Sequence, residues 1–248
     1  MSIITELKWE QLLNRTYFRV CRGAIARIGR NVKFHNCHII INSGSQLEIG
    51  NNSTIENTFI SIVNGKCVLR EHCIIGNKKN HTMLNIESGT IYIGHHTKIN
   101  AKRFWVRFGG KVHIGNYTNI NSGSEIRCDN SISIGSYNQI SYNVNIWDTN
   151  THNIMPIEER RELAKKYFPY YGKELACPKT SPIIIGNDCW LGQNVSILKG
   201  TTIENGVVVG YNCMLSGNII QANSTVVSVI QLKIKRNEND TENIPINL

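Results

Sequence analysis

The hexads IGNDCW, LGQNVS, ILKGTT, IENGVV, VGYNCM and LSGNII follow one another without a gap from Ile185 to Ile220. An aliphatic residue occupies the first position of every hexad, at Ile185, Leu191, Ile197, Ile203, Val209 and Leu215. An amphipathic helix would repeat apolar residues at intervals of three and four, so a strict period of six excludes it. Short strands separated by corners fit this period, with one aliphatic side chain per strand pointing inward and Gly or Asn at corners that favour positive φ.

The same pattern continues upstream in a looser form, aliphatic-x-aliphatic-Gly. QLEIG, TIYIG, KVHIG, SISIG and PIIIG end at Gly50, Gly94, Gly115, Gly135 and Gly186. The aliphatic positions Ile49, Leu69, Ile93, Ile114 and Ile134 lie 20, 24, 21 and 20 residues apart. Such spacing suits one turn of a three-sided coil, and ARIG at Ile28 is a candidate first turn. The sequence therefore predicts an all-β solenoid whose stacked coils share one core.

The pattern breaks once, because Ile134 and Ile185 are 51 residues apart. The break follows NIWDTNTHNI, residues 145–154, and contains PIEERRELAKKYF, residues 156–168. A proline at the start and acidic residues in the first turn predict a short helix there. The aromatics Tyr167, Phe168, Tyr170 and Tyr171 argue against disorder, so we expect a functional extended loop.

Five segments result from this reading. They are an N-terminal helical cap (1–27), β-helix coils (28–147), the extended loop with its short helix (148–182), further coils (183–227) and a C-terminal tail (228–248). The cap is predicted from the amphipathic spacing of Leu7, Leu12, Leu13 and Phe18. A peripheral contact with a membrane surface is the less favoured interpretation of the cap, because Glu6 and Glu10 dilute its basic face.

Charge and cysteine content narrow the setting. The chain has 27 Lys and Arg against 18 Asp and Glu, a net charge of +9 spread along its 248 residues, which favours anionic small ligands or acidic polymers. We find no basic and aromatic motif for nucleic acid. The eight cysteines include no CxxC pair, which indicates a reducing, cytoplasmic compartment. No signal peptide or run of membrane-spanning length is evident.

The hexads and the phrase IIIGNDCWLGQNVSILKGTTIENGVVVG resemble the hexapeptide-repeat superfamily of left-handed parallel β-helix acyltransferases. The phrase is similar to that of bacterial polysaccharide and sialic-acid O-acetyltransferases, and of galactoside and maltose acetyltransferases. The resemblance extends roughly from Ile28 to Lys235 and is most specific between Asp148 and Ser216. It implies the left-handed coil, a homotrimer with sites between adjacent coils, and acetyl-CoA as the acyl donor with no metal.

The resemblance also places a catalytic base at His152, in DTNTHNI. A histidine can take the proton of an attacking hydroxyl near neutral pH. Asp148 or Asn150 would orient its ring, and we rank Asp148 first because a carboxylate also stabilises the imidazolium. Trp190 matches the family tryptophan beside the thioester, and the backbone N–H of Gln193 matches an oxyanion donor.

The acetyl-CoA groove is expected along the coils that follow. Its predicted residues are Trp190, Gly192, Gln193, Gly210, Tyr211, Ser216, Gly217 and Lys233. Two departures affect it: relatives usually have Ala and Lys where this chain has Tyr211 and Gly217, and the usual Gly-Asn-Pro-Ala-Lys phrase is VIQLK here. Loss of a lysine weakens the expected binding of the nucleotide phosphates.

The leading hypothesis is an O-acetyltransferase acting on a sugar hydroxyl in a bacterial capsular, O-antigen or other surface polysaccharide, through a direct ternary complex. Three alternatives stay open. An N-acetyltransferase of an amino-sugar nucleotide would depend less on a general base, because a deprotonated amine attacks unaided. A non-catalytic solenoid scaffold would need no base. A zinc lyase on the same solenoid would need three converging histidines, and His95 and His113 fall at different corners when their IxIG phrases are aligned.

Overall fold

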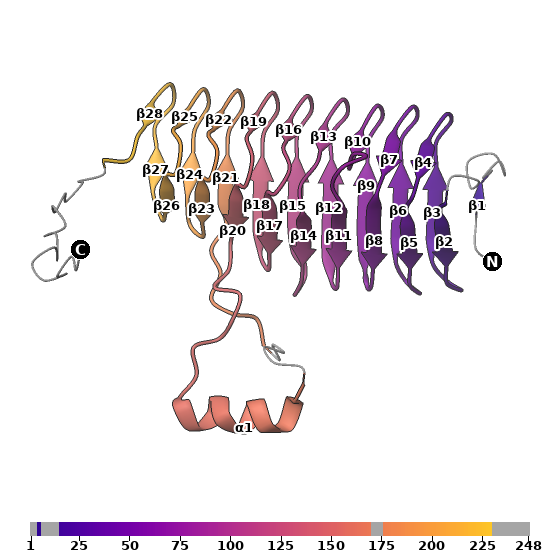
Figure 1. Cartoon of the computed structure of the whole chain (residues 1–248), viewed down its shortest axis with the longest axis horizontal. Coiled ribbons are helices and arrows are strands. Elements are labelled where there is room, and N and C mark those ends of the chain that lie inside the picture. The colour runs from indigo at the N-terminus through magenta and orange to yellow at the C-terminus, as the bar shows by residue number, and fades with distance from the viewer. Residues whose placement is uncertain (1–3, 6–14, 170–175, 230–248) are drawn as a thin grey trace, which may run out of the picture.

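The aliphatic first positions of the hexads stack on one another from turn to turn. In the computed structural model of the chain, Ile185 pairs with Ile203, Leu191 with Val209 and Ile197 with Leu215. Three hexads therefore make one turn of a three-sided solenoid, and the six hexads make two turns. The architecture is the all-β parallel solenoid that the sequence predicts, consistent with a left-handed β-helix (Figure 1).

The structure describes residues 4–5, 15–169 and 176–229, and within these it forms three parallel sheets. Sheet A contains β1 (Ile4–Thr5), β3 (Ile25–Ile28), β6 (Gln46–Ile49), β9 (Gly65–Leu69), β12 (Gly89–Ile93), β15 (Gly110–Ile114), β18 (Ser131–Ile134), β21 (Ile183–Ile185), β24 (Thr202–Ile203) and β27 (Ile219–Ile220). Sheet B contains β2 (Tyr17–Val20), β5 (His38–Ile41), β8 (Thr58–Ile62), β11 (Thr82–Ile86), β14 (Arg103–Val106), β17 (Glu125–Cys128), β20 (Asn145–Trp147), β23 (Ser196–Leu198) and β26 (Met214–Ser216). Sheet C contains β4 (Lys33–His35), β7 (Thr54–Glu56), β10 (Ile74–Ile75), β13 (Lys98–Ile99), β16 (Asn119–Ile120), β19 (Gln139–Ile140), β22 (Trp190–Leu191), β25 (Val208–Val209) and β28 (Thr225–Val226).

The chain visits the sheets in the order A, C, B and returns to A, so the solenoid has an A–C edge, a C–B edge and a B–A edge. The aliphatic residues of the looser upstream pattern form one column inside sheet A. Its members are paired in the order Ile28, Ile49, Leu69, Ile93, Ile114, Ile134, Ile185 and Ile203. The step of 51 residues between Ile134 and Ile185 is thus a single step of the coil.

Each corner has two backbone requirements, a positive φ and a close approach to the next coil, and different residues meet them. Asn52, His96, Tyr117, Tyr137 and Asp188 have φ between 54° and 62°, so the positive φ expected at corners is present, in part on bulky side chains. The glycines that end the IxIG phrases do not have positive φ. A Cβ on Gly115 would lie 2.6 Å from the backbone carbon of Gly135 on the next coil. Glycine is needed there because adjacent coils approach too closely for any side chain.

The solenoid begins earlier than the predicted boundary at residue 28. Phe18, expected in a helical cap, lies in β2 and packs partly buried against the core. β2 and β3 already belong to the first coil, because β2 pairs in parallel with β5 and β3 pairs in parallel with β6. The predicted helix residues Leu7, Leu12 and Leu13 lie outside the described residues.

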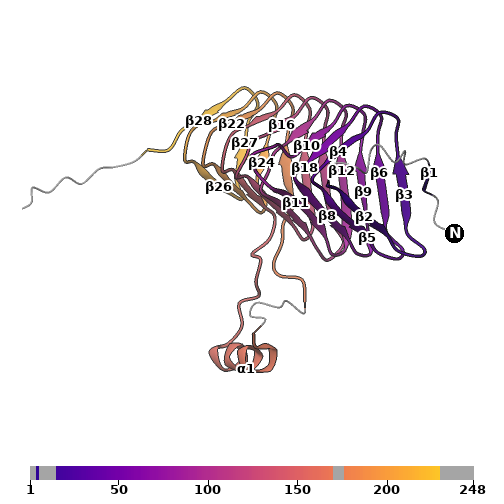
Figure 2. The ribbon, with the colours of Figure 1, turned by 45° about the vertical axis from the view of Figure 1, so that its right-hand side comes forward.

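The extended loop leaves the solenoid at the B–A edge, between β20 and β21. Its helix α1 (Ile157–Tyr167) confirms the helix expected at residues 156–168, with Glu158 and Glu159 in the first turn and Lys165 and Lys166 in the last. No residue of α1 is buried, and the helix stands away from the coils in both views (Figures 1 and 2). The expected aromatics Tyr170 and Tyr171 lie outside the described residues.

All eight cysteines are free thiols, and six of them are buried. Burial raises the pKa of the Cys67 thiol to about 12 and that of Cys73 to about 11. They fill the core as small apolar side chains, as the sequence predicts.

This arrangement predicts selective alkylation. Iodoacetamide at pH 7.5 should modify exposed Cys177 first, because a thiol must be accessible and deprotonated to react. The six buried cysteines should react only after denaturation. Peptide mass spectrometry of native and urea-treated protein measures both, and rapid native labelling of Cys67 or Cys73 would contradict the packing described.

Candidate functional site

The neck of the extended loop is a short antiparallel contact between its two ends. Thr149 and Thr180 form an isolated antiparallel bridge. The backbone N–H of Asn150 donates to the carbonyl of Lys179 at 3.0 Å, and that of Ser181 donates to the carbonyl of Asp148 at 2.9 Å. These bonds close the neck, so a loop of more than thirty residues emerges from the coil without displacing its register.

His152 emerges directly from this neck. Its side chain is exposed, whereas Thr149 and Thr151 just before it are buried, each 6% exposed or less. The side chain of His152, the predicted base, is therefore accessible to solvent, while the backbone just before it is buried against the coil. Asn150, the second candidate to orient its ring, is half-buried.

Asp148 is buried and has a well-defined structural task. Its Oδ1 accepts a hydrogen bond from the backbone N–H of Asp129 at 2.8 Å, and its Oδ2 accepts one from that of Asn130 at 2.9 Å. Burial raises the pKa of the Asp148 carboxyl above its usual range, against the opposing effect of these hydrogen bonds. Both oxygens thus serve the backbone of the preceding coil, and a role in orienting His152 stays a prediction.

A buried ion pair lies under the same neck, formed by two residues that the sequence analysis did not select. Arg107 donates from Nε and Nη2 to the two carboxylate oxygens of Asp129, at 2.9 and 2.7 Å. Asp129 also accepts a hydrogen bond from the hydroxyl of Thr149 at 2.6 Å. A usable signal existed, since Arg107 and Asp129 are 22 residues apart and Asp129 and Thr149 are 20 residues apart, which is one coil per step.

Sheet B carries a row of cation–π contacts beside this ion pair. The guanidinium carbon of Arg107 lies 4.3 Å from the ring centre of Trp105, and that of Arg127 lies 4.3 Å from Trp147. Burial opposes ionisation of Glu125, but hydrogen bonds from Arg127 and Arg103 outweigh it and hold the pKa of Glu125 below its usual range. Within this row, Arg127 also donates to the hydroxyl of Thr151 at 3.4 Å, which links the row to the start of the loop.

Trp190 lies in β22 on sheet C, with 58% of its surface exposed. It borders an open pocket of about 410 Å³ that Asn121, Gln139, Ile140 and Ser141 also line. Gln193 follows in the turn at the C–B edge, and no described residue accepts a hydrogen bond from its backbone N–H. An aromatic surface, a hollow and an available N–H therefore occur together on this side.

The structure divides the predicted site residues between two edges of the solenoid. Trp190 and the predicted groove residues Gly192, Gln193, Gly210 and Tyr211 lie on sheet C or at the C–B edge. His152, Ser216 and Gly217 lie at the B–A edge, because each follows or ends a strand of sheet B. The width of sheet B separates the two sets, roughly 15 Å at about 3.3 Å per residue.

Individual groove residues differ in what holds them. Tyr211 is 65% exposed, and its hydroxyl accepts a hydrogen bond from Asn194 at 3.3 Å. Gly217 has φ of 69° and its N–H donates to the hydroxyl of Thr201 at 3.2 Å. Lys233, the predicted phosphate ligand, lies outside the described residues.

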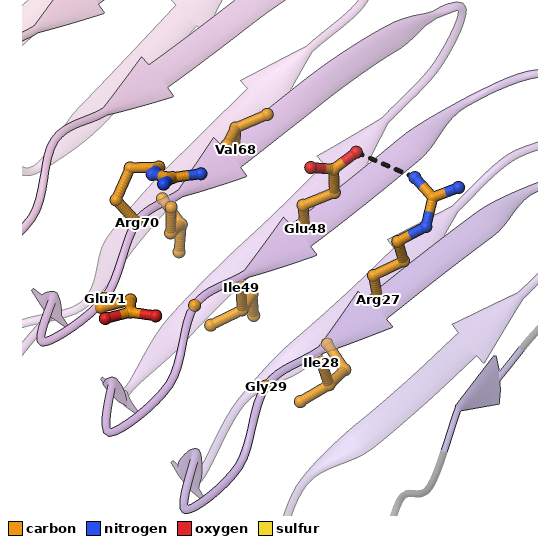
Figure 3. A pocket seen from close by; sticks show the side chains of 10 residues that line it. Arg27, Ile28, Gly29, Glu48, Ile49, Val68, Arg70 and Glu71 are labelled. Carbon is orange, nitrogen blue, oxygen red and sulfur yellow. Dashed lines mark hydrogen bonds and ion pairs between the residues drawn. The ribbon is translucent and has the colours of Figure 1, made fainter.

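A second hollow, of about 250 Å³, lies on the first coils near the N-terminus (Figure 3). Arg27 and Glu48 point toward each other in it and form an ion pair of 3.0 Å. Lys66 also pairs with Glu48 at 3.1 Å. This hollow shares no residue with the predicted site, and its Glu48 is compensated by Arg27 and Lys66.

The positions of the histidines concern the zinc-lyase alternative, and the length and apolarity of the helices concern a contact with a membrane. His95 contacts His96, with 2.9 Å between their Nδ1 atoms, whereas His113 stacks on Tyr92. Within residues 4–5, 15–169 and 176–229, no three His, Cys, Asp or Glu side chains are grouped as metal ligands. The same part of the chain contains no helix of the length and apolarity that crossing a membrane requires.

The role of Asp148 can be tested through stability. Asp148→Ala should lower the free energy of unfolding by about 2–4 kcal/mol, because two backbone N–H groups, one buried and one partly buried, lose their acceptor. Asn150→Ala should change it by less than about 1 kcal/mol, since its neck contact uses only the backbone. Urea unfolding of both variants measures the difference, and equal stabilities would contradict the structural task assigned to Asp148.

Comparison with known proteins agrees with this architecture. Residues 182–217 match the family described as bacterial transferase hexapeptide (six repeats). "Putative lipopolysaccharide biosynthesis O-acetyl transferase WbbJ" of Escherichia coli (strain K12) is 30% identical over 130 residues, which are 52% of this chain and 62% of that protein. The galactoside O-acetyltransferase of Lactococcus lactis subsp. lactis (strain IL1403) is 29% identical over 140 residues, 56% of this chain and 59% of that protein.

The chain thus spans about three fifths of the length of these two curated relatives. Among solved structures, the polySia specific acetyltransferase NeuO superposes with a TM-score of 0.49 at 19% identity, over 93% of this chain and 92% of that chain. The predicted resemblance to the hexapeptide-repeat acyltransferases is confirmed over residues 182–217, which match the six repeats of that family, and the two O-acetyltransferases are similar over about half of this chain.

Proposed function

We propose that this protein transfers an acetyl group from acetyl-CoA to a hydroxyl group of a sugar, with His152 as the general base. The observation that carries this proposal is the exposed His152 on a neck anchored in the coil, at the position where the resembled family has its base. The two O-acetyltransferases among the relatives support a hydroxyl acceptor. Lipopolysaccharide biosynthesis, in the name of one of them, supports a bacterial surface polysaccharide.

The chemistry requires two proton transfers and one acetyl transfer in one ternary complex. The imidazole of His152 removes the proton from the acceptor hydroxyl while the hydroxyl oxygen attacks the thioester carbonyl. The tetrahedral intermediate places its negative charge on the former carbonyl oxygen, which accepts a hydrogen bond from the backbone N–H of Gln193. The intermediate collapses with loss of the CoA thiolate, which takes the proton from the imidazolium. No covalent acyl-enzyme is needed.

Trp190 would hold the thioester end of acetyl-CoA. Its exposed indole and the adjacent hollow offer an apolar wall and polar groups, the composition expected of a ligand site. Gly192, Gly210, Tyr211, Ser216, Gly217 and Lys233 are proposed to line the remaining groove. Tyr211 narrows it compared with the alanine of relatives.

A trimer would complete the site, because one chain carries its halves on two different edges. If three solenoids pack side by side, the B–A edge of one protomer can face the C–B edge of its neighbour. His152, Ser216 and Gly217 would then meet Trp190 and Gln193 of the neighbour. The helix α1 supports this packing, since none of its residues is buried within its own chain.

We place the reaction in the cytoplasm. The eight free cysteines suit a reducing compartment, and acetyl-CoA would be available there.

The first test replaces the base. His152→Ala should lower kcat for acetyl transfer by about 10²–10⁴-fold, the usual contribution of a general base, while the trimer and its melting temperature stay unchanged. Mass spectrometry of candidate glycans incubated with acetyl-CoA measures the gain of one acetyl group. Full activity of His152→Ala would support a scaffold or a different base, and acetylation of amines alone would support the N-acetyltransferase.

A second test addresses the shared site. His152→Ala and Trp190→Ala homotrimers should each be weakly active, whereas trimers assembled from both chains should regain activity. In a mixed trimer, one interface combines an intact His152 with an intact Trp190 of the neighbour. Differently tagged chains, co-expressed and purified on both tags, provide the sample, and doubly tagged His152→Ala trimers provide the control. Activity no higher than in the controls would refute the shared site.

A further inference from the structure

The residue before His152 has an unfavourable backbone conformation. Thr151 has φ of 69°, in the left-handed region that β-branched residues rarely adopt. It is also buried, with 5% of its surface exposed. Such a conformation persists only where its surroundings hold it in place.

Two hydrogen bonds hold the main chain of Thr151 from both sides. Its carbonyl oxygen accepts from Nη2 of Arg107 at 3.2 Å, and its N–H donates to the hydroxyl of Thr149 at 3.0 Å. The carbonyl belongs to the peptide plane that Thr151 shares with His152. Because that plane is rigid, fixing its oxygen also fixes the direction in which the chain enters His152.

The group that holds this carbonyl is itself fully constrained. The side chain of Arg107 is 7% exposed and that of its ion-pair partner Asp129 is 1% exposed. The guanidinium stacks on Trp105 and lies 5.1 Å from the ring centre of Phe108. Asp129 also accepts a hydrogen bond from the hydroxyl of Thr149, so one carboxylate supports both hydrogen bonds to Thr151.

We infer that Arg107 and Asp129 are positioning residues for acetyl transfer, which set the direction of His152 by holding Thr151 in its left-handed conformation. The inference rests on the proposed function, since it concerns how the proposed base is oriented. A buried ion pair is a costly way to obtain stability alone, because both charges lose their hydration. A bidentate, planar contact is well suited to fixing a carbonyl in one direction.

The test separates positioning from folding. Arg107→Met and Thr149→Val should each lower kcat by about 10- to 100-fold per folded protomer, with KM for acetyl-CoA within about twofold, because misorientation affects chemistry more than binding. Thr149→Val keeps the ion pair of Arg107 with Asp129 and the side-chain volume at position 149. It therefore measures the effect on kcat even if Arg107→Met does not fold. Arg103→Met is the matched control: Arg103 stacks on the same Trp105 and pairs with Glu125, but its described contacts do not include residues 148–152.

A rescue experiment addresses the conformation directly. Glycine adopts positive φ without strain, so Thr151→Gly should make the enzyme less dependent on Arg107. In the Thr151→Gly background, the loss caused by Thr149→Val or Arg107→Met should be at least about fivefold smaller than in the native background. Equal losses in both backgrounds, or an equal loss in Arg103→Met, would overturn the inference. Activity retained in His152→Ala would instead remove the proposed function, and that variant is measured alongside.

Discussion

The column of aliphatic side chains inside sheet A, from Ile28 to Ile203, is the constraint on which the rest of the structure depends. No single coil buries its inward residues, so each turn is stable only when it stacks on its neighbours. The stacking sets the parallel register, and the register places every corner above the corner before it. Close approach of coils then requires the glycines of the IxIG phrases, while Asn, His and Tyr adopt the positive φ that the corners need.

This register explains how a long loop can leave the solenoid without disturbing it. Ile134 and Ile185 pair as adjacent coils although 51 residues separate them. The bridge between Thr149 and Thr180 closes the neck, and the Asp148 carboxylate ties the departing strand to the preceding coil. These contacts fix the backbone where the loop starts, so the position of a residue close to the neck is also fixed. His152 is exposed and lies one residue beyond Thr151, which the neck holds.

The buried groups below the neck differ in what they contribute. Asp148 satisfies backbone N–H groups, which any buried coil edge requires. Arg107 and Asp129 instead form a buried ion pair that holds the neck. Arg107 donates to the carbonyl of Thr151, and Asp129 accepts from the hydroxyl of Thr149. The outer face of sheet B continues this support through Trp105, Arg127 and Trp147. A rigid sheet face thus anchors the start of the loop that carries His152.

Inward residues and corners recur at fixed intervals in the sequence, and this period is enough to predict the coil and the loop that interrupts it. The proline and the acidic residues of the first turn predict a helix over residues 156–168, and the structure forms it over 157–167. The sequence also leads us to propose His152 and Trp190 as site residues, through resemblance rather than through spacing. The separation of these two residues on one chain becomes visible only in the folded coil, since sheet membership depends on how many corners lie between them. The same holds for Arg107 and Asp129, whose meeting under Thr151 depends on coil stacking. Local sequence encodes each turn, but contacts between turns exist only after the coils are stacked.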